Sequence, residues 1–574
     1  MNFNHLKLRN FTVLTSAITV ALALTSCRGC QQKQAIDIRT LPAGDTHTAF
    51  IVNNFNDFIN GLNGFFTKLT SHGGAEQFSL VRQKIKQQYN FDIFDSKSFN
   101  AWGIDPQAGL IAFTEGQSQK ENYVLAIGIN DQQKFDEIFK KYIAAQLSSD
   151  KFGNEQVGKY TLQRAGRPFG TEIVYGVSWV HVGNVVLVAF VDGDESIRTV
   201  LKRLEQNNNN KNKNATNLLN DAVFRKTTAK IPAKYPVLYV RGDINARKPI
   251  KQNSKNSLFA ETTIYHSIAT SIKIDDSGLN FETYIELPVP GSNFDKALAS
   301  EPPVAMLKHI AANALIAGIS RAAKPKTLAA IRTQPFLLQW LNQVLSLAHQ
   351  ETSLDPEKEI LPLLTGASTL SVYLNKFNGV AGKLQRRPSF NSLLDFIHIV
   401  ATAEVTDEKA MFSALENSRK SMQKRGIEMN LQQIRFDKKE IKIYTRAIPK
   451  NANATFTPKL GWALFGNTYV YAAGANRLSQ ALNLLKGGEP TLEQKLASSS
   501  IKLTEQTGTS VLIIRPYVLL DELTKLKKLD TNNSVDIVAM IPTALKLLQA
   551  IGDIVISVSG EPDGLRIKLS EQLQ

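Results

Sequence analysis

A serine and a lysine on one predicted helix are the residues best placed to do chemistry. Ser421 and Lys424 stand three residues apart, in the order Ser-Met-Gln-Lys. Side chains at this spacing lie side by side on a helix, so the lysine could take the proton of the serine hydroxyl. The pair therefore predicts one reaction, nucleophilic attack by Ser421 with Lys424 as base. A serine hydrolase is the alternative function that this pair leaves open.

The surrounding sequence favours a structural role for the pair. Its spacing resembles the S-x-x-K motif of penicillin-binding proteins, but their partner motifs S-D-N and K-T-G are absent. Gln506 stands before Thr507-Gly508, where the K-T-G motif needs a lysine. Arg419, Lys420 and Arg425 surround the pair, which is typical of an exposed basic helix end. A non-catalytic role is therefore favoured, and no catalytic residue is assigned.

Metal and nucleotide sites are not indicated. The chain has eight histidines, and no two lie three or four residues apart, so no helix can present a His-His ligand pair. Cys27 and Cys30 are the two cysteines, which leaves the body without a disulfide or a cysteine-based zinc site. Residues 379–383 have two glycines and a lysine but are shorter than a phosphate-binding loop, and Leu384 replaces the magnesium-binding hydroxyl. We expect no metal and no cofactor.

The N-terminus reads as an export signal. Lys7 and Arg9 precede residues 11–24, an uncharged run that is too short to span a bilayer comfortably and is typical of a signal peptide. The run ends in Leu24-Thr25-Ser26-Cys27, which resembles the lipobox of bacterial lipoproteins. The resemblance implies removal of residues 1–26, diacylglycerol on the Cys27 thiol and an acyl chain such as palmitate on the new amino group. An ordinary cleaved signal with a chance cysteine is the alternative.

The lipobox resemblance implies a location in the cell envelope. Two or more acyl chains give stable membrane anchoring, and residues 27–40 would form the lipidated tether. An aspartate directly after the lipidated cysteine is associated with inner-membrane retention in Gram-negative lipoproteins. Arg28 stands at that position in this chain, which favours the outer membrane if the source is Gram-negative. Cys30 is interpreted as a spare thiol near the membrane.

The charge of the chain favours an anionic partner. The formal net charge is +16, and removal of the leader with Lys7 and Arg9 lowers it by two to +14. Anionic lipid, polysaccharide or another envelope protein are the expected partners, and nucleic acid is not expected because stacking aromatics are not evident. Within one segment only Asp243 opposes the candidate anion-binding residues, which are Arg225, Lys226, Lys230, Lys234, Arg247, Lys248 and Lys251. Simple solvated surface is the alternative.

Five landmarks occur twice in the same order, shifted by 274 to 286 residues. One is a strand that runs into a helix at Asp131 and again at Asp407. Another is a hairpin at 179–184 and 462–467, where Gly-Asn between apolar runs predicts a two-residue turn. The remaining three are an amphipathic helix, a strand and a closing hairpin. Five matches in register predict a tandem duplication of one module.

Each half mixes helices with strands that turn back through tight hairpins. This pattern predicts an α+β fold with a mainly antiparallel sheet and helices packed on it, which we expect on one face. A chain of 574 residues exceeds what one core usually builds. The predicted domains are a first module at 41–290, a linker at 291–303 and a second module at 304–574.

The opening of the first module resembles a known architecture. Residues 41–46, Leu-Pro-Ala-Gly-Asp-Thr, resemble the opening segment of uncharacterised secreted bacterial proteins built from repeated α+β modules. That resemblance implies no known activity. Together these patterns predict a membrane-anchored cell-envelope lipoprotein with a non-catalytic binding or scaffolding role.

Overall fold

The computed structural model describes the body of the chain with gaps. The described residues are 37–44, 46–71, 76–89, 92, 94–114, 123–147, 151–169, 172–190, 194–209, 217–242, 265–291, 293–298, 301–321, 325–374, 397–436, 439–447, 459–474, 476–497, 508–519 and 551–573. Cys27, the leader, most of the predicted tether and Arg247, Lys248 and Lys251 lie outside these residues. The chain divides into two units, with the boundary between Glu286 and Leu287.

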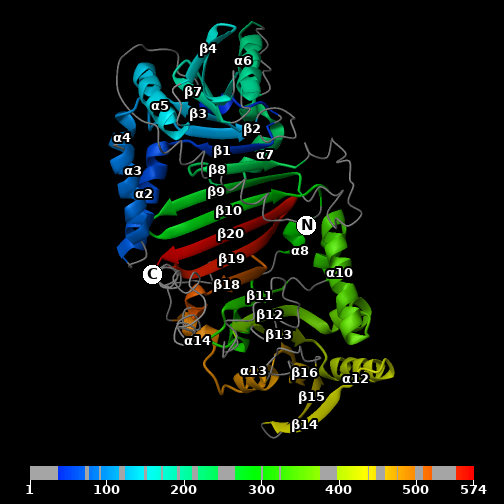
Figure 1. The fold of residues 1–574 in the computed structure, drawn as a ribbon. Coiled ribbons are helices and arrows are strands. Elements are labelled where there is room, and N and C mark those ends of the chain that lie inside the picture. The colour runs from blue at the N-terminus through cyan, green and yellow to red at the C-terminus, as the bar shows by residue number, and fades with distance from the viewer. Residues whose placement is uncertain are drawn as a thin grey trace. The chain divides into compact units, whose positions relative to one another are not determined.

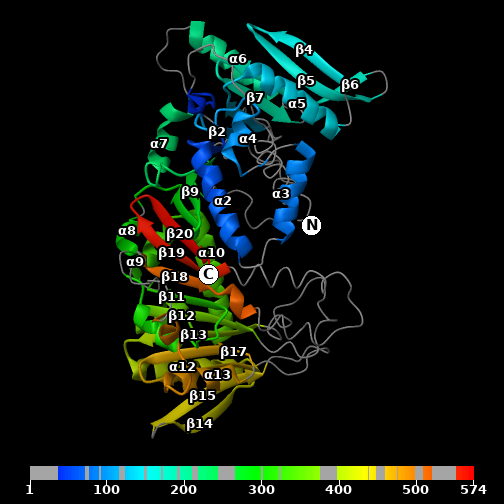
Figure 2. The same ribbon diagram turned by 90° about the vertical axis from the view of Figure 1, so that its left-hand side faces the viewer.

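The described part of the first unit contains one antiparallel sheet (Figure 1). Its strand order is β4-β5-β6-β7-β3-β2-β1-β8-β9-β10. The strands are β1 Thr48–Val52, β2 Leu110–Thr114, β3 Tyr123–Gly128, β4 Lys151–Val157, β5 Tyr160–Phe169, β6 Glu172–Val182, β7 Val185–Phe190, β8 Val237–Arg241, β9 Ser267–Asp275 and β10 Gly278–Glu286. In Figure 2, β4, β5 and β6 extend as long hairpins beside α5 and α6.

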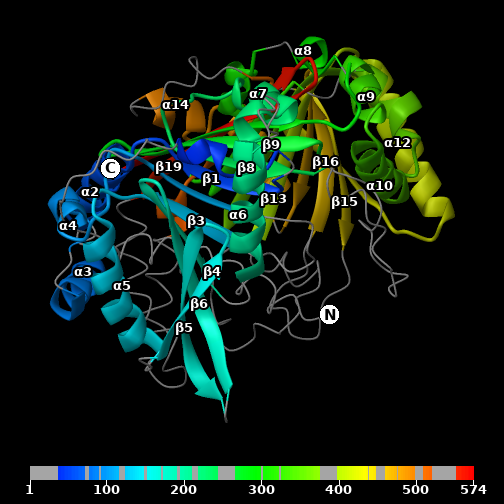
Figure 3. The same cartoon turned by 90° about the horizontal axis from the view of Figure 1, so that it is seen from above.

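Helices cover both faces of this sheet (Figure 3). One core packs α2 Phe55–Ser71, α4 Ser96–Asn100 and α5 Gln132–Leu147 against the sheet, and the other packs α6 Asp194–Asn209 and α7 Ala222–Thr228. The remaining elements are α3 Glu76–Tyr89 and the short helices η1 Ile38–Thr40 and η2 Leu218–Asn220. The expectation of helices on one face was wrong, because all five side chains of the central strand β2 are buried although they point alternately to the two faces of the sheet.

The described part of the second unit also contains one antiparallel sheet. Its strand order is β14-β15-β16-β17-β13-β12-β11-β18-β19-β20. The strands are β11 Ile316–Ser320, β12 Leu364–Leu374, β13 Ile397–Val405, β14 Asn430–Phe436, β15 Lys439–Ala447, β16 Lys459–Phe465, β17 Thr468–Ala473, β18 Ser510–Ile514, β19 Ile551–Glu561 and β20 Gly564–Leu573.

Two cores again flank this second sheet. One contains the apolar side chains of α13 Arg477–Leu485, α14 Leu492–Ala497 and η4 Val304–His309, and the other contains those of α12 Glu408–Lys424. The remaining elements are α8 Phe294–Ala297, α9 Pro325–Arg332, α10 Pro335–Thr352, the π-helical turn η5 Pro356–Ile360 and η6 Leu361–Leu363. None of the described helices is long and apolar enough to cross a membrane.

The two units have the same strand order, each strand of the first matching the strand numbered ten higher in the second. The register also agrees, because Trp179 pairs with Val188 across β6 and β7, and Trp462 pairs with Tyr471 across β16 and β17. Gly183 and Gly466 turn these hairpins with positive φ, a conformation that glycine adopts readily. The α+β class with a mainly antiparallel sheet is confirmed. Descent of both units from one duplicated module stays a prediction.

Candidate functional site

The structure places Ser421 and Lys424 near the C-terminal end of α12. Both residues lie in the last turns of α12, where Ser421 is half-buried and Lys424 is exposed. Neither residue lines the cavity described below, which Ser418 reaches from one turn earlier. The described residues also hold no group of three or more His, Cys, Asp or Glu side chains placed to bind a metal ion.

The described part of the basic patch is partly neutralised by acids from other segments. Lys226 Nζ lies 2.6 Å from Glu286 Oε1, and nearby Arg241 Nη1 lies 3.0 Å from Asp221 Oδ2. Lys230 lies over the Tyr284 ring with its Nζ 5.7 Å from the centroid. From the sequence, Asp243 was the only acid expected to oppose the positive charge of this segment. The acidic residues that the fold brings close from outside the segment were missed. Arg225 and Lys234 are exposed.

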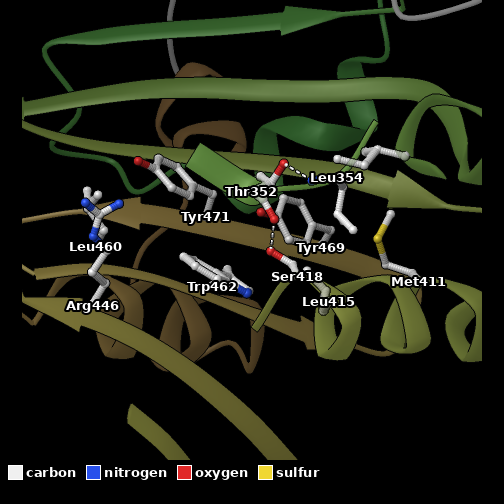
Figure 4. A pocket seen from close by; sticks show the side chains of 11 residues that line it. Thr352, Leu354, Met411, Leu415, Ser418, Arg446, Leu460, Trp462, Tyr469 and Tyr471 are labelled. Atoms are coloured by element: carbon white, nitrogen blue, oxygen red, sulfur yellow. Dashed lines mark hydrogen bonds between the residues drawn. The ribbon is translucent and has the colours of Figure 1, made fainter. Parts of the chain in front are cut away.

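A cavity of about 170 Å³ lies in the second unit, between α12 and the sheet (Figure 4). Most of its walls are aromatic or aliphatic. The side chains that line it are Thr352, Leu354, Ile360, Met411, Leu415, Ser418, Arg446, Leu460, Trp462, Tyr469 and Tyr471. This cavity is the candidate functional site.

Aromatic side chains on β16 and β17 build the sheet wall of the cavity, and Tyr444 on β15 packs beside Trp462. Tyr444, Trp462 and Tyr471 are direct cross-strand neighbours on β15, β16 and β17. The rings of Tyr444 and Trp462 stack with centroids 6.3 Å apart and an interplanar angle of 14°. The Tyr444 hydroxyl donates to Glu416 on α12 at 3.1 Å, which ties the stack to the helix. Since aromatic cross-strand pairs stabilise sheets, the wall is built on a rigid element.

Helix α12 supplies the opposite wall. Asp407 caps its N-terminus by accepting a hydrogen bond from the Ala410 backbone N–H at 2.9 Å. Met411, Leu415 and Ser418 then follow at spacings of four and three residues, so they share the face that is turned to the sheet. This face of α12 therefore forms the wall opposite the aromatic side chains.

The C-terminal end of α10 closes the cavity. Ser353 ends this helix in the left-handed conformation with φ 55°, which turns the chain so that Thr352 and Leu354 both reach the cavity. Two side chains from α12 and its C-cap hold this turn. The Ser418 hydroxyl donates to the Thr352 carbonyl oxygen, and Arg425 Nη1 donates to Ser353 Oγ at 2.7 Å.

The polar groups of the cavity are few and unevenly placed. The Trp462 side chain is 5% exposed, and its indole Nε1 has no hydrogen-bond partner among the described residues. Figure 4 shows Nε1 at the end of the ring nearest Ser418 and Leu415, while Arg446 lies at the other end beside Tyr471. Burial raises the pKa of the Tyr469 hydroxyl above its ordinary value, so this group stays neutral.

Larger side chains stand at the corresponding helix positions of the first unit. Counted from the capping aspartates Asp131 and Asp407, Phe139 matches Leu415 and Tyr142 matches Ser418. The Phe139 ring packs edge-on against Trp179 with centroids 5.0 Å apart. Two smaller side chains at matching helical positions thus leave room in the second unit.

Comparison with known proteins places this chain in a family. The model of a family described as "Protein of unknown function (DUF3352)" matches residues 104–423, more than half of the sequence. The chain belongs to the DUF3352 family. No curated protein and no solved structure matches it.

The matched region of this DUF3352 chain includes α12 except for its last residue but ends before β16 and β17, so it contains only part of the cavity wall. Sequence reasoning also missed the cavity. Trp462 was recognised as a hairpin landmark, but its presence in both halves indicated a structural role. The overlooked signal was the replacement of large side chains by small ones at matching helical positions.

Proposed function

We propose that this chain is a lipid-anchored protein of the bacterial cell envelope whose second unit binds a small apolar ligand without transforming it. The anchoring part rests on the lipobox resemblance at Leu24 to Cys27. The binding part rests on the cavity under α12, which is the single observation that carries the proposed function.

The size and lining of the cavity support apolar binding. A sealed cavity in a protein core destabilises its surroundings by about 24 cal/mol per Å³, so a space of about 170 Å³ corresponds to at most about 4 kcal/mol. That is a large part of the roughly 5–15 kcal/mol by which domains are stable. A ligand that fills the space recovers much of this loss, and a cavity of about 150 Å³ suffices for a benzene ring.

The lining favours binding over chemistry. The described residues around the cavity include no carboxylate, histidine or cysteine that could act as acid, base or thiolate. The one serine, Ser418, donates its hydroxyl proton to a backbone carbonyl oxygen and so is not activated by a neighbouring base. A site with rigid apolar walls and few polar groups is the usual form of a ligand pocket.

Titration with ethylbenzene tests the proposed binding. The chain beginning at residue 28, which is the proposed mature form without its lipid, is titrated in a calorimeter with ethylbenzene as an apolar probe of ring size. We expect saturable binding with one site. The Ser418→Tyr variant should lose it, because Tyr142 occupies the matching position in the first unit and its ring would fill the cavity.

Ser421→Tyr is the matched control. It adds the same side chain to the same helix three residues further on, at a position that does not line the cavity. Its ethylbenzene affinity should equal that of the parent chain. Absence of binding by the parent, or equal binding by the Ser418→Tyr variant, would remove the cavity from the proposed function.

A further inference from the structure

We propose that the ligand of this cavity is an uncharged apolar molecule with one hydrogen-bond acceptor, such as a carbonyl, ester or ether oxygen, which accepts from Trp462 Nε1. This inference rests on the proposed function, since it names the chemical class of ligand for the same site.

The Trp462 indole is a buried donor that needs an acceptor. Its Nε1 has no partner among the described residues, and the side chain is 5% exposed. Leaving a buried N–H group unsatisfied costs about 1–3 kcal/mol, so such donors in proteins are almost always paired. A ligand in the cavity could supply the missing acceptor, because the ring end that carries Nε1 points toward Ser418 and Leu415, which also line the cavity (Figure 4).

The first unit shows what this indole position requires. Trp179, at the matching hairpin position, donates from Nε1 to Asp136 Oδ1 at 2.9 Å. Asp136 is the fifth residue after the capping Asp131, and the fifth residue after Asp407 is Phe412. The Phe412 ring cannot accept in this way, and it lies under the Lys442 ammonium with Nζ 4.4 Å from its centroid. At these matching positions the second unit thus keeps the Trp462 donor but has no carboxylate to accept from it.

The surroundings of Trp462 favour a neutral acceptor over an anion. In the first unit, Asp136 has further support, with His181 Nε2 at 2.8 Å and Gln163 Nε2 at 2.7 Å. Burial alone would raise the pKa of Asp136, but these hydrogen bonds bring it below its usual value. In the second unit, Leu464 stands at the position of His181, and Tyr444 stands at the position of Gln163.

Neither of these residues can support a buried carboxylate. Leucine has no donor, and the Tyr444 hydroxyl already donates to Glu416. A carboxylate beside Trp462 would therefore lose its water and gain only the one hydrogen bond from Nε1. The free-energy cost of burying this charge is far higher than that of burying a carbonyl group. Arg446 lies at the opposite end of the cavity and does not supply this support (Figure 4).

The test compares three probes that share one ring: acetophenone, ethylbenzene and benzoate. A neutral hydrogen bond contributes modestly, so acetophenone should bind about threefold to tenfold more tightly than ethylbenzene, and benzoate should bind most weakly. Trp462→Phe keeps a ring at the site and removes the donor. Its ethylbenzene affinity should stay within about twofold of the parent, and the preference for acetophenone should disappear.

An independent measurement uses the parent chain alone. The protein has four tryptophans, so ¹⁵N-tryptophan labelling gives few indole signals, and the Trp462 signal is the one missing from the Trp462→Phe variant. Acetophenone should move this signal downfield, ethylbenzene should move it much less, and the Trp179 signal should stay in place.

The outcomes separate the two proposals. Equal affinities for acetophenone and ethylbenzene, with no downfield shift, would overturn the acceptor inference and leave apolar binding intact. Tighter binding of benzoate would also overturn it, in favour of an anionic ligand. Failure of all three probes to bind would overturn the proposed function itself.

Discussion

Replacing Ser418 with tyrosine should stabilise the second unit or leave its stability unchanged. Inserting a large side chain into a packed core normally destabilises a protein by about 1–3 kcal/mol. Ser418 differs from an ordinary core position because it lines a cavity of about 170 Å³. Tyr142, at the matching position in the first unit, shows that this position on the helix accommodates a phenol ring.

The expected magnitude follows from three contributions. Complete filling of the cavity would contribute at most about 4 kcal/mol. Loss of the hydrogen bond from Ser418 to the Thr352 carbonyl removes about 1 kcal/mol. Strain from imperfect fit removes about 1–3 kcal/mol more, so the net change should lie between zero and about 2 kcal/mol of stabilisation.

Hydrogen exchange in increasing urea measures this change within a protein of two units. Protection of the amides in β16 and β17 reports unfolding of the second unit, whereas protection of β6 and β7 reports the first. We expect the β16 and β17 transition to move to higher urea or to stay, with the β6 and β7 transition unchanged. Destabilisation of the second unit by more than about 1 kcal/mol would show that the space is too small to hold a ring.

Three further predictions concern the anchor, the pH dependence and the surface. Labelled palmitate should enter the parent chain in its bacterial host but not Cys27→Ser, and equal labelling would contradict lipidation. Burial lowers the pKa of His309 and His398 to about 4, so between pH 6.5 and 4 the unfolded chain binds more protons than the folded one. Stability of the second unit should therefore fall by about 2 kcal/mol per histidine from pH 7 to pH 5, and an unchanged urea midpoint would contradict this. Changing exposed Arg225 and Lys234 to glutamine should weaken binding of the unlipidated chain to anionic vesicles by about 1 kcal/mol each at low salt, whereas salt-insensitive binding would leave the patch as solvated surface.

The patterns that predicted the fold depend on near neighbours in the sequence. Gly183 and Gly466 mark tight turns because the two flanking strands are only two residues apart. Asp131 and Asp407 mark helix starts because capping involves residues three positions on. Such local signals recur in both halves and were enough to predict an α+β class with antiparallel pairing.

The features that escaped prediction depend on residues far apart in the sequence. Glu286 pairs with Lys226 across 60 residues, so the neutralised part of the basic patch could not be inferred from its own segment. The cavity combines side chains from α10, α12 and three strands. Its volume is the small difference between the space that these elements enclose and the volume of the side chains that fill this space. The one sequence signal of the cavity was that Leu415 and Ser418 in the second half stand where the first half has Phe139 and Tyr142.

A crystal structure of the chain with acetophenone tests the central claim most directly. The predicted result is a ring between Leu415 and Tyr469, with its carbonyl oxygen about 2.9–3.0 Å from Trp462 Nε1. The matching space beside Trp179 in the first unit should hold no acetophenone, because Phe139 and Asp136 occupy it. An empty cavity under α12, or equal occupancy of both units, would contradict the assignment of the second unit as a ligand-binding module.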